Sequence, residues 1–148
     1  MSITLDYVSI EPVSKPVAVQ VVAETEPLWE SYDWWAEGIY LAQRKSDSRL
    51  EGSTRIRLGG YGDVEVPEKE EALMVCKDTS FVVSKLSQWS AKYNVSWKLS
   101  ELDSEVGRIV GGKPSPNLTN YISSLCSGLK LPLSKASAVL EKHKARKE

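Results

Sequence analysis

The chain has 148 residues, of which 41% are hydrophobic and 26% charged, and its formal net charge is −1. This length and composition suffice for a hydrophobic core, so we expect residues 1–148 to form a single α+β domain. A net charge near zero provides no general attraction for nucleic acids or anionic membranes, and no apolar run approaches the roughly 20 residues of a membrane span. Because the N-terminus lacks a basic region followed by an apolar one, we expect a cytoplasmic location and no membrane contact.

Two cysteines, Cys76 and Cys126, both lie among apolar neighbours. Thiols stay reduced in the cytoplasm, where a free cysteine behaves as a small buried hydrophobic residue. The sequence therefore predicts two buried free thiols and no disulfide.

The N-terminal part of the chain contains two strand-like patterns. Residues 3–10 alternate loosely between apolar and polar side chains. Residues 17–23 are rich in valine, whose β-branched side chain favours strands. We expect the two segments to pair as an antiparallel hairpin.

Residues 27–44 fit two structures. Thr25 followed by Glu26 and Pro27 is typical of a helix start, and apolar residues then recur at helical spacing. Residues 34–43 also alternate as a strand does. We favour a helix over residues 27–44 and keep the strand as the alternative.

Two alternating runs, residues 54–58 and 63–66, flank four residues that include three glycines, Gly59, Gly60 and Gly62. Glycine supplies the positive φ angles that a tight loop between strands requires. The pattern predicts a hairpin.

The stretch from residue 72 to 109 has the clearest patterning. Residues 72–76 form a continuous apolar run that fits a strand buried on both faces, although the run also extends a helix begun at Pro67. Residues 78–80 offer N-cap side chains to a helix over residues 82–93, which Asn94 ends. Residues 95–100 and 106–110 follow as two strands.

These elements predict how the sheet is connected. Two strands that bracket a helix suggest a right-handed crossover between parallel neighbours. Residues 106–110 return antiparallel to residues 95–100 through a short acidic turn.

The C-terminal region predicts two helices. Ser115 followed by Pro116 is a strong helix start, and Ser134 caps the last helix. The short connection between them indicates an antiparallel helix pair. We therefore expect an α+β fold with a mixed or antiparallel sheet, helices packed on one face, and a C-terminal α-helical hairpin. We expect seven residues to be buried together: Leu86, Trp89, Trp97, Leu99, Leu118, Ile122 and Leu125.

No pattern in the chain indicates catalysis, a metal or a cofactor. Glu101, Asp103 and Glu105 alternate in a turn and do not form a calcium loop. Residues 59–62 lack the spacing of a phosphate-binding loop, and His143 is the only histidine. We expect no catalytic residue, no metal ligand and no cofactor, and an enzymatic activity is not indicated.

Aromatic residues are the main functional signal. The chain has five tryptophans and six tyrosines but one phenylalanine, and large amphipathic rings are favoured in binding surfaces. The segment 27–44 holds more of them than one buried helix face can accommodate. We predict a partner-binding site formed by Trp29, Tyr32, Trp34, Trp35 and Tyr40.

These residues favour a non-enzymatic interaction domain with a protein partner, such as a toxin-neutralising immunity protein, a phage-encoded protein or a regulatory factor. One alternative is a small-molecule or glycan site on a Trp/Tyr platform, which would require a concave pocket. Another is nucleic-acid binding through the basic C-terminal helix, because the region from Lys130 onward has six basic residues against two acidic ones, a net charge of +4. The sequence does not indicate an oligomeric state.

Overall fold

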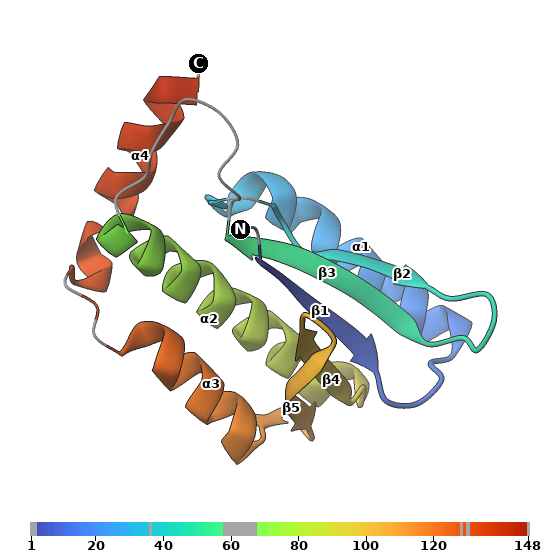
Figure 1. Cartoon of the computed structure of the whole chain (residues 1–148). Coiled ribbons are helices and arrows are strands. Elements are labelled where there is room, and N and C mark those ends of the chain that lie inside the picture. Colours follow the sequence, from blue (N-terminus) through green and yellow to red (C-terminus); the bar gives the residue numbers. More distant parts are fainter. Residues whose placement is uncertain (1–2, 36, 58–67, 128, 130, 148) are drawn as a thin grey trace.

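The computed structural model describes residues 3–35, 37–57, 68–127, 129 and 131–147 (Figure 1). It confirms an α+β fold, with four helices and a six-stranded antiparallel sheet in the described part of the chain. In chain order the elements are β1 (Ile3–Ser9), α1 (Lys15–Ser31), β2 (Tyr40–Gln43), β3 (Leu50–Arg57), α2 (Glu68–Tyr93), β4 (Trp97–Glu101), β5 (Ser104–Val110), β6 (Lys113–Pro114), α3 (Pro116–Cys126), a short 3-10 helix (Leu133–Lys135) and α4 (Ala136–Lys147).

The sheet has the strand order β2-β3-β1-β4-β5-β6, and each neighbouring pair is antiparallel. The part β1-α1-β2-β3-α2-β4 forms a split β-α-β arrangement, in which β3 lies between β1 and β2, as in ferredoxin-like folds. β5 and β6 extend the sheet beyond β4. The expected parallel crossover is wrong, because the segment that precedes the helix over residues 82–93 is itself helical.

The main hydrophobic core lies between one face of the sheet and helices α1, α2 and α3. On β1, Leu5 and Tyr7 are buried whereas Asp6 between them is exposed, so the other sheet face is open to solvent. The predicted core is confirmed for Leu86, Trp89, Trp97, Leu99 and Leu118, and Ile122 and Leu125 pack half-buried against it.

Residues 17–23 belong to α1, so the predicted hairpin with residues 3–10 is wrong. Pro16 lies in the first turn of the helix, where no intrahelical partner exists for an amide proton. Ala18 and Val21 enter the core from one helix face. Burial of this face outweighs the strand preference of the valines.

The helix predicted over residues 27–44 is wrong beyond Ser31. Tyr32 adopts an extended backbone and closes α1, so Pro27 lies inside the helix instead of at its start. The strand alternative is confirmed only for residues 40–43, which form β2.

Residues 72–76 are part of α2, which confirms the helical alternative and overturns the buried strand. Leu73, Met74, Val75 and Cys76 are all buried because α2 contacts the sheet, α1, α3 and α4. Residues 78–80 therefore lie within the helix and are not its N-cap. The end of α2 agrees with the prediction, since Asn94 has a φ of 57°.

The glycine-rich hairpin is tested only in part. Residues 54–57 form the end of β3, which pairs with β1 and β2. The glycines and the second run, residues 58–67, lie outside the described residues.

Cys76 and Cys126 form a disulfide that joins α2 to α3. The prediction of free thiols is therefore wrong. The sequence shows no proximity between the two residues, but the packing of α3 on α2 places their Cα atoms 5.2 Å apart. This separation is within the range that a disulfide can span.

The C-terminal helices both pack on α2, with α3 also covering β5 (Figure 1). The Ser115 hydroxyl accepts a hydrogen bond from the Leu118 amide at 3.3 Å, which confirms Ser115 as the N-cap of α3. α4 contributes Ala136, Val139 and Leu140 to a second buried cluster. None of the described helices combines the length and the apolar composition that a membrane span requires.

Candidate functional site

Three aromatic rings form a cluster where α1 ends. Tyr32 stacks on Phe81 of α2, with ring centroids 3.7 Å apart and an interplanar angle of 5°. Trp34 meets both rings edge-on, at 4.6 Å from Tyr32 and 5.3 Å from Phe81. All three side chains are half-buried, so each retains contact with solvent. We call Tyr32, Trp34 and Phe81 the ring cluster.

Hydrogen bonds hold the ring cluster in place. The indole Nε1 of Trp34 donates to the Leu28 carbonyl oxygen at 2.8 Å. The ammonium group of Lys77 donates to the Tyr32 hydroxyl at 3.0 Å and to the Asp33 carbonyl oxygen at 2.7 Å. The segment after α1 is therefore fixed both to α1 and to α2.

A buried carboxylate lies beneath these contacts. Asp78 is fully buried in α2, and its Oδ1 lies 2.8 Å from Lys77 Nζ. Its Oδ2 accepts a hydrogen bond from the Trp35 backbone amide at 2.8 Å. Burial raises the pKa of the Asp78 carboxyl above its ordinary value, and the neighbouring Lys77 acts in the opposite direction. This arrangement anchors residues 33–35 and explains why the sequence places a carboxylate in the middle of a helix.

Trp29 lies beside the ring cluster and is the most exposed of the five tryptophans, with 49% of its surface exposed. A β-carbon added at Gly38 would lie 3.0 Å from the Trp29 ring and 3.1 Å from Trp34 Nε1. Gly38 therefore leaves the space in which both indoles are accommodated. Trp29 and the ring cluster together form what we call the aromatic surface.

The structure divides the five predicted site residues among three places. Trp29, Tyr32 and Trp34 lie on the aromatic surface. Trp35 is 3% exposed and packs in the second buried cluster with Leu73 and Met74. Tyr40 is exposed on β2, where Leu41 faces the core, so its side chain points to the opposite side of the sheet from the helices. Three of the five predicted site residues therefore lie together, and Trp35 and Tyr40 lie elsewhere.

Phe81 is a member of the surface that sequence reasoning missed. It is the only phenylalanine, and it lies on α2, far along the chain from Tyr32. Nothing in the local sequence around Phe81 indicates that its side chain faces away from the core. Only the packing of the segment after α1 onto α2 reveals the contact.

A second feature is a shallow cleft of about 330 Å³ on the open face of the sheet. Its lining is mainly polar and contains none of the aromatic-surface residues; it consists of Asp6, Tyr7, Val8, Arg44, Glu51, Gly52, Lys98, Ser100 and Asp103. Partial burial, together with the negative charge of Asp103, raises the pKa of the Asp6 carboxyl. Its volume is at the low end of the range for small-molecule sites.

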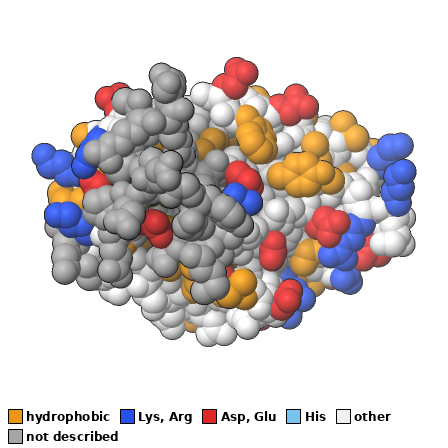
Figure 2. Space-filling model, turned by 45° about the horizontal axis from the view of Figure 1, so that its top comes forward, with side chains coloured by type: hydrophobic (Ala, Val, Ile, Leu, Met, Phe, Trp, Pro, Cys, Tyr) orange, Lys and Arg blue, Asp and Glu red, His pale blue; other side chains and the backbone are white. Residues whose placement is uncertain are grey.

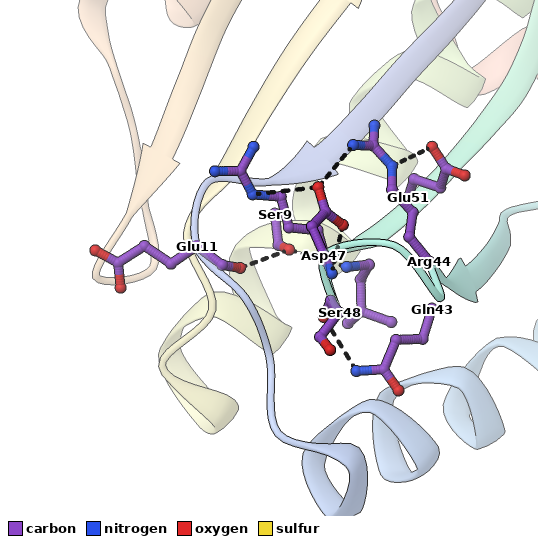
Figure 3. A network of polar contacts seen from close by, with 9 residues as sticks. Ser9, Glu11, Gln43, Arg44, Asp47, Ser48 and Glu51 are labelled. Atoms are coloured by element: carbon purple, nitrogen blue, oxygen red, sulfur yellow. Dashed lines mark hydrogen bonds and ion pairs between the residues drawn. The ribbon is translucent and has the colours of Figure 1, made fainter.

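Polar contacts at the β2–β3 turn hold the residues on one side of this cleft (Figure 3). Arg44 lies between two carboxylates, with its Nε 2.7 Å from Glu51 and its Nη1 3.2 Å from Asp47. The side-chain amide of Gln43 donates to the Ser48 carbonyl oxygen at 3.0 Å. These contacts hold the turn in shape, so Arg44 has a structural explanation that requires no ligand.

Of the three acidic residues singled out in the sequence, Asp103 lines the cleft, whereas Glu101 and Glu105 belong to neither feature. Glu101 pairs with the Tyr121 hydroxyl, and Glu105 forms an ion pair with Arg108 at 3.2 Å. In the described part of the chain, no group of three or more His, Cys, Asp or Glu side chains could hold a metal ion. The His143 side chain and residues 59–62 lie outside the described part.

Comparison with protein-family models, with curated protein sequences and with solved structures finds no match for this chain. The evidence for a function therefore comes from the aromatic surface alone. In the view of Figure 2, exposed hydrophobic side chains lie among acidic ones on the same face.

Proposed function

We propose that this protein is a non-enzymatic interaction domain that binds a protein partner through its aromatic surface. The observation that carries the proposal is the pairing of an exposed indole, Trp29, with a ring cluster fixed by hydrogen bonds to Leu28 and Lys77. Tryptophan and tyrosine are enriched among residues that dominate binding energy.

The fixed positions of the rings in the aromatic surface support this proposal. Binding normally loses the rotamer freedom of the side chains that become ordered, at about 0.5–1.5 kcal/mol for each flexible one. The rings of Tyr32 and Trp34 are already held in one arrangement by Phe81 and Lys77. A partner would therefore meet a surface whose conformational entropy has largely been lost during folding.

The aromatic platform for a small molecule or glycan receives less support. That hypothesis requires a concave pocket lined by the rings. The cleft on the open sheet face contains none of these rings and is lined mainly by charged and polar groups. A protein partner suits a set of half-buried rings with an exposed indole beside them.

The disulfide changes the proposal for location. The cytoplasmic location was expected from the N-terminal sequence and implied reduced thiols, but Cys76 and Cys126 are joined. Disulfides persist in oxidising compartments and in the cytoplasm of some hyperthermophiles. We propose that the protein acts in one of these environments.

Site-specific photocrosslinking tests the proposal. A benzophenone amino acid replaces Asp33, an exposed residue between Tyr32 and Trp34, in one variant and Tyr40 in a control, because both residues are exposed but lie on different surfaces. In a lysate of the source organism, we expect a crosslinked protein with the probe at position 33 only, and excess unlabelled protein should compete it away. Equal crosslinking at both positions, or none at position 33, would contradict the proposal.

A further inference from the structure

The outward face of α1 is apolar and uncovered. Pro16, Val19, Ala23 and Pro27 recur at i, i+3, i+7 and i+11, which places them on one side of the helix, and all four are exposed. Val19 is 59% exposed. We call these four residues the α1 stripe. Nothing in the described part of the chain packs over it.

The composition of α1 makes this exposure unusual. From Pro16 to Ala23 the only polar residue is Gln20, so apolar side chains occur on every side of this half of the helix. A helix with apolar side chains on every side is normally buried on every side by other parts of the protein or by a membrane. Ala18 and Val21 are covered by the core, and the opposite side, which holds the α1 stripe, is not.

We propose that the α1 stripe binds the α1 stripe of a second copy of this chain, with the two helices nearly antiparallel and Ala23 at the two-fold axis. The stripe is self-complementary about this residue. In such a pair Val19 lies opposite Pro27 of the other copy, and this contact occurs twice. The small side chain of Ala23 permits close approach of the helices at their crossing point, where interaxial distances depend on side-chain size.

Charge complementarity selects a second copy and sets the orientation. Lys15 is the only basic residue of α1, and Glu30 lies at the other end of the helix. Both are exposed, and neither forms an ion pair with the residues that the structure describes. Antiparallel pairing places Lys15 of each copy beside Glu30 of the other, whereas parallel pairing would bring like charges together. Antiparallel helix dipoles favour the same orientation.

One helix face per subunit is a small interface. Interfaces at the low end of the size range support weak and transient association. The dimer should therefore be reversible, with a dissociation constant in the micromolar range or weaker. The aromatic surface does not include the α1 stripe, so this inference stands or falls independently of the proposed function.

Sedimentation equilibrium of the full chain tests the interface. We expect the average mass to rise with concentration from 16.5 kDa towards twice that value. Ala23→Arg, which places two cations and extra bulk at the axis, should remain monomeric, while Ser46→Arg, which adds the same charge in an exposed turn, should behave as the wild type. A wild type that stays monomeric up to millimolar concentration, or a dimer that survives Ala23→Arg, would overturn the proposal.

A charge exchange tests the orientation. Lys15→Glu and Glu30→Lys should each weaken the dimer at least several-fold, and the double variant should restore it. Independently, Ala23→Cys should form a disulfide-linked dimer under mild oxidation, because the native cysteines are already paired, whereas Ser46→Cys should not. Failure of the double variant to restore association, together with no preferential crosslinking at position 23, would exclude antiparallel pairing about Ala23.

Discussion

The carboxylate of Asp78 accepts a hydrogen bond from the backbone amide of Trp35, 43 residues earlier in the chain, at 2.8 Å. This contact fixes the segment between α1 and β2 to the middle of α2. Because Asp78 also pairs with Lys77, which binds Tyr32 and the Asp33 carbonyl, one buried carboxylate holds the base of the aromatic surface.

Removal of this carboxylate should destabilise the protein strongly. Asp78→Ala leaves the Trp35 amide and the Lys77 ammonium without their partner, and we expect a loss of about 3–5 kcal/mol in the free energy of unfolding by urea. Asp78→Asn keeps an oxygen for the amide and should cost less, about 1–3 kcal/mol. As a control, Glu105→Ala removes one half of an exposed ion pair and should change stability by less than about 1 kcal/mol. A loss for Asp78→Ala no larger than that control would show that the anchor is unimportant.

The same group predicts a pH dependence with a definite sign. Burial raises the folded-state pKa of Asp78 above its ordinary value of 3.8, so the folded protein binds this proton more tightly than the unfolded chain does. The part of the stability that comes from protonation of Asp78 is therefore fully present below pH 3.8 and is lost as the pH rises through the folded pKa. We expect the free energy of unfolding of the wild type, minus that of Asp78→Asn, to fall as the pH increases from 3.8. A difference that rises over this range would mean that the ion pair with Lys77 outweighs burial.

The disulfide predicts both a mass and a stability effect. The native protein should contain no titratable thiol, and its intact mass should increase by two hydrogens on reduction. Since the bond closes a loop between residues 50 apart, reduction should lower the free energy of unfolding by about 2–4 kcal/mol. Two reactive thiols in the native protein would contradict the pairing of Cys76 with Cys126.

Trp29 and Trp35 should respond differently to truncation. Trp35→Ala removes a side chain that is 3% exposed and should cost about 3–5 kcal/mol. Trp29→Ala removes a half-exposed ring and should cost about 1 kcal/mol or less. Urea unfolding measures both values, and similar losses would mean that Trp29 is part of the core.

Hydrophobic periodicity correctly predicted the helices and strands that bury only one face. Val82, Leu86 and Trp89 recur at helical spacing because one side of α2 faces the core there, and Trp97 and Leu99 alternate because only one side of β4 is covered. Periodicity failed where apolar residues occur on every side. Residues 17–23 and 72–76 therefore looked like strands, although the first belongs to a helix with an exposed apolar stripe and the second to a helix covered by several neighbours.

The candidate site, like the fold, was predicted from the sequence only in part. Aromatic crowding after residue 28 indicated Trp29, Tyr32 and Trp34, which lie together. The separation of Tyr40 follows from the alternation of β2, which required the correct secondary structure. Phe81 and the Asp78 anchor depend on contacts between segments distant in sequence, which no local pattern encodes.

The affinity of Trp29→Ala for the crosslinked partner tests the central claim most directly, with Tyr40→Ala as the matched control. We predict that Trp29→Ala raises the dissociation constant by about 30-fold or more, equivalent to at least about 2 kcal/mol, while its stability stays within about 1 kcal/mol of the wild type. Tyr40→Ala should bind as the wild type does. Equal affinities for the wild type and Trp29→Ala would contradict the assignment of the aromatic surface as the binding site.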